Sequence, residues 1–295
     1  LATGFVRVEQ VGCAAAALVG ISLNLVVGAT AMAFAGRDPY PESTPESAAT
    51  SPARESATPD LDAARVARDA TLAAGVSGFA TLGHEVLSTR LLVYGFHATT
   101  HALAIVLAVF LLGLALGARA VAGPLRRATA RPEHMGLALL AAAALSLGFA
   151  PSLLQTSTLV EGLRGHHVGW WTWLTVEALI AAALLLPTTF AMGLVFPLAM
   201  GFVASSRKPG ETVGRAVWVN TLASVAGSLG AGFVLVPALG VRGSIVALTL
   251  VQALAGAYLF ARHARARRYA GWAGVAGVAL FGALWAERAT VGAPP

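Results

Sequence analysis

Ionisable side chains inside long apolar stretches are the residues of this chain best suited to chemistry. Six of them are candidates for a substrate-binding site: His84, Glu85, Arg90, His97, His101 and Glu177. Charged groups within a bilayer are costly, so they are rare there and usually functional. One interpretation is a water-accessible cavity whose carboxylates hold a small cation while the histidines tune their protonation. The other is structural, with Glu85 paired to Arg90 or a neighbouring helix and the histidines in the interfacial layer.

Metal and cofactor chemistry have little support in the sequence. His97 and His101 are four residues apart on one helix face and could bind a metal ion with a carboxylate, but such a pair is too common to assign a metal site. The single Cys13 excludes a Cys-based site within one chain. The sequence contains neither a Walker A motif nor a GxGxxG motif after a strand, so no cofactor is expected. No catalytic residue is assigned, and enzymatic activity is left undecided.

The composition predicts that lipid surrounds most of the chain. Of its 295 residues, 57% are hydrophobic and 12% are charged, whereas soluble domains carry about 25% charged residues. Helices of about 20 apolar residues cross a bilayer. Such stretches occur at 11–35, 71–93, 98–122, 135–154, 170–203, 216–238, 243–261 and, marginally, 270–286. We therefore expect an all-α polytopic transmembrane bundle of about eight helices, with no soluble catalytic domain.

The basic residues predict the orientation of this bundle. They gather in loops after the third, fifth and seventh apolar stretches, which places these loops on one side of a bacterial inner membrane, the cytoplasmic side. A basic chain can bind nucleic acid, but scattered loop arginines form no basic face, so nucleic acid is not expected as a partner. Counted from Asp69 at the cytoplasmic face, Glu85 lies about 25 Å along its helix, in the outer half. Trp170, Trp171 and Trp173 are expected to form an outer interfacial belt.

One linker divides the chain. The stretch 36–67 is rich in Pro, Ser, Thr, Glu and Asp, a composition that cannot bury enough apolar surface to fold. We expect a disordered cytoplasmic linker there. It separates a leading helix within 1–35 from a seven-helix membrane domain over 68–287, which a tail, 288–295, follows.

Small and polar residues predict where helices meet. The expected packing residues are Gly113, Gly117, Asn220, Ser224, Ser228 and Gly232. Whether they pack within the chain or against another subunit is left open. Pro187 and Pro197 each remove a backbone hydrogen bond from the stretch 170–203, which predicts a helix break or kink. A break would point to a transport site, and a kink would be structural.

Four segments, read together, resemble a known family. They are VSGFATLGHEVLSTRLL (76–92), AVFLLGLALGA (108–118), MGLVFPLA (192–199) and VNTLASVAGSLGAGFVLVPALGVRGS (219–244). In order and spacing they resemble the membrane region of spermidine-synthase-like bacterial proteins, which fuse a transporter-like region to a polyamine aminopropyltransferase domain. Glu85 and Arg90 match the family motif, while His84 stands where the family has Tyr and Ser88 where it has Trp.

The resemblance implies a function for the membrane region. It would anchor a synthase domain that follows residue 295, and it would bind or transport polyamine or a similar small cation. The alternative is a non-catalytic structural or accessory subunit of a larger membrane complex. The sequence leaves open the substrate, the coupling ion and the oligomeric state.

Overall fold

The structure is a computed structural model that describes residues 58–96, 99–163, 169–205 and 209–263, together with a few residues between 18 and 30. The chain forms two compact units, Leu1–Pro59 and Asp60–Pro295. The described residues of the first unit are helical, and the hydroxyls of Ser22 and Thr30 donate to carbonyl oxygens one turn earlier, Leu18 O and Val26 O. Residues 36–57 of the expected linker 36–67 and the tail of 288–295 lie outside the described residues.

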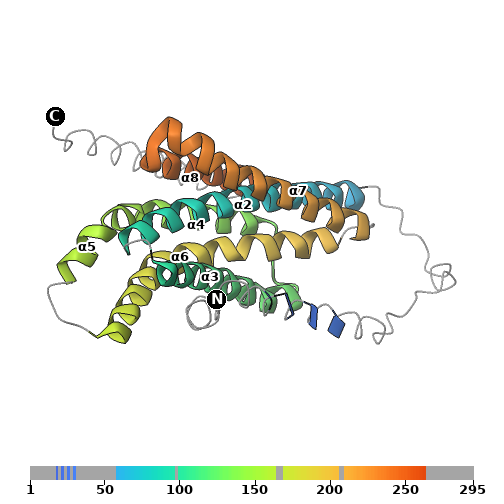
Figure 1. Cartoon of the computed structure of the whole chain (residues 1–295). Coiled ribbons are helices and arrows are strands. Elements are labelled where there is room, and N and C mark those ends of the chain that lie inside the picture. The colour runs from blue at the N-terminus through green and yellow to red at the C-terminus, as the bar shows by residue number, and fades with distance from the viewer. Residues whose placement is uncertain are drawn as a thin grey trace. The chain divides into compact units, whose positions relative to one another are not determined.

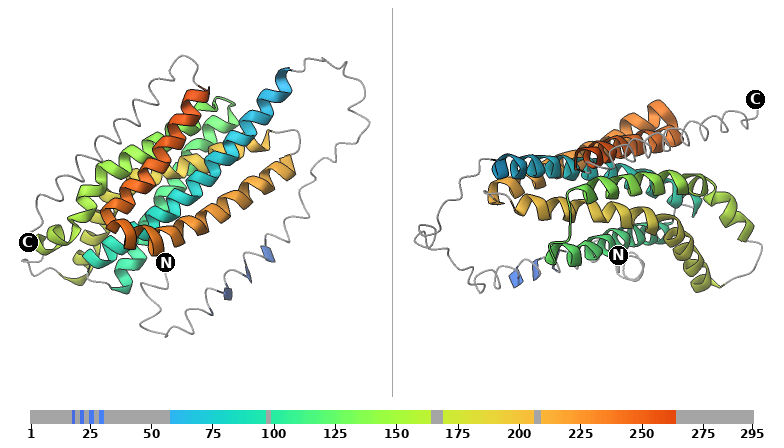
Figure 2. Two further views of the ribbon diagram at one scale, coloured as in Figure 1. Left: turned by 90° about the horizontal axis from the view of Figure 1, so that it is seen from above. Right: turned by 180° about the vertical axis from the view of Figure 1, so that it is seen from behind.

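Helices make up all the secondary structure in the described part of the second unit (Figure 1). In chain order they are α2 (Thr58–Gly95), α3 (Thr100–Arg126), α4 (Glu133–Leu154), α5 (Thr156–Leu163), α6 (Trp170–Ala204), α7 (Pro209–Leu229), the π-helical turn η3 (Gly230–Leu235) and α8 (Val236–His263). The prediction of an all-α bundle is confirmed for these residues. The long helices lie side by side along a common direction in both views of Figure 2.

The described residues contain four helical stretches long and apolar enough to span a membrane, Thr100–Arg126, Glu133–Ser152, Trp170–Ala204 and Pro209–His263. They are compatible with a multi-pass membrane protein in a lipid bilayer. The expected count of eight is not found. The stretch 270–286 and most of 11–35 lie outside the described residues, and 71–93 belongs to α2, which is not among the four. Two further predicted stretches, 216–238 and 243–261, both lie within the last of the four, Pro209–His263.

That last stretch contains a reversal of the chain at Gly240. Its 55 residues would extend about 82 Å as one straight helix, far beyond a hydrocarbon core of about 30 Å. Gly240 has φ 66° and ψ 176°, a conformation that is essentially restricted to glycine. The hydroxyl of Ser244 donates to the Gly240 carbonyl oxygen at 2.6 Å. The chain turns back there, so α7 and the long part of α8 form two legs of a hairpin (Figure 2).

α2 begins earlier in the chain than the sequence predicts. α2 begins at Thr58, so residues 58–67, assigned above to the linker, are helical. Pro59 is tolerated there because first-turn N–H groups have no partner within the helix.

α6 continues through Pro187 and Pro197 without interruption, and it bends in its N-terminal half rather than breaking (Figures 1 and 2). The hydroxyl of Thr189 donates to the Leu185 carbonyl oxygen at 2.8 Å, a side-chain contact that bends helices without ending them.

Glycines allow three pairs of helices to approach closely. Between α3 and α6, a Cβ on Gly117 would overlap the Phe190 carbonyl oxygen, and a Cβ on Gly193 would lie 2.8 Å from Leu114 Cα. Between α4 and α8, a Cβ on Gly136 would lie 2.7 Å from the Gly256 carbonyl oxygen. Backbones this close gain dispersion energy along the whole contact, which is the main attraction between helices in lipid.

The third close pair is α2 with α7. A Cβ on Gly78 would lie 2.6 Å from both Asn220 Oδ1 and Ser224 Oγ, and one on Gly227 would overlap the Phe79 carbonyl oxygen. A cluster of buried apolar side chains joins α2, α4, α6 and α8 nearby, including Ala73, Leu139, Leu198 and Leu259. The bundle is therefore held together by contact along its whole length.

We predict that Gly117→Ala destabilises the protein, because the added methyl group forces α3 away from the α6 backbone. Overpacking of this kind costs about 1–3 kcal/mol. Gly123→Ala is the matched control, since a Cβ on Gly123, in the same helix, meets no atom within 4 Å. Unfolding by SDS from mild-detergent micelles, followed by circular dichroism, measures the difference. Equal midpoints for the two variants would contradict the close contact.

Candidate functional site

The structure divides the six predicted site residues. His84 is 5% exposed and lines a small central cavity with Ser88, one turn along α2. Glu85 is half-buried and Arg90 is exposed on the same helix, and neither lines this cavity. His97 lies outside the described residues. The expected pairing of Glu85 with Arg90 is not among the ion pairs of the described residues.

His101 and Glu177 are both buried near the start of their helices. The His101 ring stands edge-on to Trp170, with ring centroids 5.2 Å apart and planes at 87°. Glu177, two turns further along α6, is 3% exposed. Trp170 and Trp171 are exposed, as expected of an interfacial belt, although Trp170 also partners a histidine.

The central cavity lies between α2, α3, α4, α6 and α8. Its volume is about 20 Å³, which is space for about one water molecule. Five polar side chains line it, namely His84, Ser88, Ser146, Thr188 and Thr189. Its other walls are apolar side chains, and no acidic or basic residue besides His84 contributes to it.

A larger and more open cleft lies between α2, α3, α6 and α7. Its volume is about 220 Å³. Four polar side chains line it, Ser77, Thr81, Asn220 and Ser224, and Gly78 lets α7 approach so closely that Asn220 and Ser224 reach it. Met192 borders both this cleft and the central cavity.

The expected packing residues have different surroundings. Gly113 and Gly117 lie against α6, where a Cβ on Gly113 would overlap Thr189 Oγ1. Asn220 and Ser224 contact α2 and also line the cleft. A Cβ on Gly232 would lie 3.8 Å from Val86 Cγ1, which is an ordinary van der Waals distance. No unusually close helix contact therefore depends on this glycine.

Sequence reasoning missed most of the polar lining. Ser77, Thr81, His84 and Ser88 follow one another at spacings of four, three and four residues, which places them on one face of α2. All four line one of the two cavities. The spacing was visible in the sequence, but serine and threonine are uncharged and common at helix contacts, so they drew less attention than the ionisable residues.

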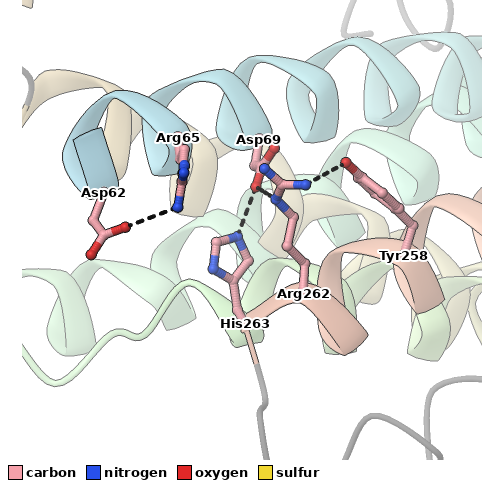
Figure 3. A network of polar contacts seen from close by, with 6 residues as sticks. All are labelled: Asp62, Arg65, Asp69, Tyr258, Arg262 and His263. Atoms are coloured by element: carbon pink, nitrogen blue, oxygen red, sulfur yellow. Dashed lines mark hydrogen bonds and ion pairs between the residues drawn. The ribbon is translucent and has the colours of Figure 1, made fainter.

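A third polar cluster joins α2 to the end of α8 (Figure 3). Asp69, whose side chain is 2% exposed, lies 2.7 Å from Arg262 Nε and 3.1 Å from His263 Nε2 through Oδ2. Arg262 also donates to the Tyr258 hydroxyl at 3.0 Å and lies over the Tyr258 ring. Asp69 thus has a fixed role as an anchor of α8. The described residues hold no group of three or more His, Cys, Asp or Glu side chains placed to bind a metal ion.

We predict that Asp69→Asn destabilises the bundle, because it leaves Arg262 beside a buried neutral side chain. Removing one partner of a buried pair costs about 3–5 kcal/mol, and partial exposure of Arg262 places the expected loss at the lower end. Asp62→Asn is the matched control on the same helix, since its pair with Arg65 is exposed and such pairs contribute about 0–1 kcal/mol. Chemical unfolding in detergent compares the two. A similar loss in both would show that burial adds nothing to the pair.

Comparison with known proteins gives no guide to this site. No protein-family model matches the chain, and searches of curated proteins and of solved structures find no match. The resemblance to spermidine-synthase-like proteins therefore rests on the four segments quoted above.

Proposed function

We propose that this chain is the membrane domain of a spermidine-synthase-like protein of the bacterial inner membrane, with its Arg-rich loops in the cytoplasm. In this proposal it anchors a synthase domain and binds or transports polyamine or a similar small cation. One observation carries the proposal. Every residue that lines the open cleft falls within one of the four segments that resemble the family.

The four segments are far apart in the chain, so their meeting at one cleft is a property of the fold. The first supplies Ser77 and Thr81, and the last supplies Asn220 and Ser224. The other two supply the apolar walls, among them Leu114 and Phe196. A resemblance caused by membrane composition alone would scatter over lipid-facing surfaces. Convergence on a polar cleft supports a shared site instead.

The chemistry of the cleft suits a cation that binds weakly. An ammonium group donates hydrogen bonds, and the Asn220 carbonyl oxygen and the three hydroxyl oxygens of the lining can accept them. No carboxylate lines the cleft, so a bound cation keeps part of its hydration and can leave again, as conduction requires. The buried carboxyl group of Glu177 lies elsewhere in the bundle, two helical turns before Leu184 of the central cavity.

One observation favours the accessory-subunit alternative. The helical stretch formed by α7 and η3 has three buried residues, Ala216, Gly227 and Ala231. Its exposed apolar residues include Trp218, Leu222, Val225, Leu229 and Phe233, which follow one side of the helix. Such a face contacts lipid or a partner helix. Under this alternative, spermidine causes no thermal shift and the chain co-purifies with defined partner polypeptides.

We predict that Asn220→Ala slows uptake of labelled spermidine into proteoliposomes. A hydrogen bond to a charged group contributes about 1.5–3 kcal/mol, which corresponds to a fall of about 10-fold to 100-fold in affinity. Thr221→Ala is the control, because Thr221 is the next residue, is exposed, and bonds only to its own helix at Val217 O. Uptake by the wild type no faster than by protein-free liposomes, or equal uptake by both variants, would sink the proposal.

We also predict that Glu177→Gln slows spermidine uptake, since it replaces a buried carboxyl group with an amide of similar shape. Glu85→Gln is expected to have a smaller effect, because Glu85 is half-buried whereas Glu177 is buried, and neither residue lines a cavity. Both variants are measured in the same proteoliposome assay at matched protein content. If both take up spermidine as the wild type does, these carboxylates have no part in the mechanism.

A further inference from the structure

We propose that His84, Ser88, Ser146 and Thr188 form a binding site for one water molecule in the centre of the bundle. The four side chains come from α2, α4 and α6 and line the cavity of about 20 Å³. This site is separate from the cleft that carries the proposed function, and it does not depend on that function.

The hydrogen bonding of His84 defines one side of the site. His84 Nδ1 lies 2.9 Å from the Ala80 carbonyl oxygen. A carbonyl oxygen only accepts, so Nδ1 carries the proton, and Nε2 of the neutral ring is left as an acceptor. Nε2 is buried and has no hydrogen-bond partner in the structure. His84, which lines the cavity, therefore has an acceptor atom without a partner.

Ser146 lines the same cavity from α4. It is 3% exposed on α4, and its hydroxyl is buried without a hydrogen-bond partner. Ser88 and Thr188 add two more hydroxyls to the lining. Buried polar atoms are nearly always satisfied by protein or by ordered water. His84 and Ser146 line the same small cavity from different helices and each has such an atom without a partner, which supports a small ligand that bonds to both.

Size and charge select water among small ligands. The cavity exceeds the space of about 10–15 Å³ that one water needs, and a buried water makes about three hydrogen bonds. The water molecule would donate one hydrogen bond to His84 Nε2 and form others with the serine and threonine hydroxyls. Together these bonds reach that number. A cation would have no carboxylate partner in this lining, and burying an unpaired charge is far costlier. The ligand is thus neutral and donates at least one hydrogen bond.

Solid-state NMR of the full chain in lipid bilayers tests the site. The protein is labelled with ¹⁵N-histidine, and His84→Gln identifies the His84 signals by their loss. We expect a neutral ring with the proton on Nδ1, and transfer of magnetisation from water to the His84 ring. Ser146→Val fills the cavity and should abolish that transfer, and Ser88→Ala should weaken it. Thr249→Val, which removes a buried hydroxyl outside the cavity, should leave it unchanged.

Three results would overturn the proposal. The first is a His84 ring protonated at Nε2, and the second is water transfer that persists unchanged in folded Ser146→Val protein. The third is a ring signal that responds only when ammonium chloride is added, which would make the occupant a cation. Spermidine uptake is not read in this experiment, so a failure here is distinguishable from failure of the transport proposal.

Discussion

Close contact between helix backbones is the constraint on which this bundle depends. Lipid is as apolar as the helix surfaces, so burial of leucine or valine gives little drive for association, and contact distance decides stability. Gly117 and Gly193 bring α3 onto α6, and Gly136 and Gly256 bring α4 onto α8. With larger residues at these positions the helices would separate, and the cavities between them would lose their walls.

The same closeness determines where polar groups can be used. Gly78 brings Asn220 and Ser224 up to α2, so an amide and a hydroxyl that could have faced lipid instead line a cleft. Asp69 of α2 pairs with Arg262 and His263 at the end of α8. Both clusters obey one rule, that a polar group at depth needs a partner or a pocket. They differ because Asp69 is committed to an anchor, whereas the cleft residues keep free hydrogen-bonding capacity.

Much of the helical architecture was predictable because apolar length determines it. The stretches 98–122, 135–154 and 170–203 correspond closely to α3, α4 and α6. The reversal at Gly240 lies in the gap left between 216–238 and 243–261, although the helical assignment runs through it. The prolines of α6 left a break and a kink open, and the helix is continuous and bent, since Pro187 removes only one hydrogen bond and the neighbouring turns hold the helix.

The site was less predictable, because convergence depends on the tertiary fold. Ionisable residues were grouped by depth along their helices, but depth does not determine which face of a helix points inward. His84 and Glu85 are adjacent in the chain but lie on different faces of α2. His84 lines the central cavity and Glu85 does not. The stripe of Ser77, Thr81, His84 and Ser88 had the right spacing, yet its partners Ser146 and Asn220 come from helices whose rotation only the fold determines.

Met192 borders both the open cleft and the central cavity, so the two compartments share one thioether wall. Methionine is unbranched and has three rotatable bonds, which lets its tip swing while the α6 backbone stays fixed. Because Met192 packs against Ala142 and Ala191 in the buried core, a change of its rotamer would alter the walls of both compartments at once.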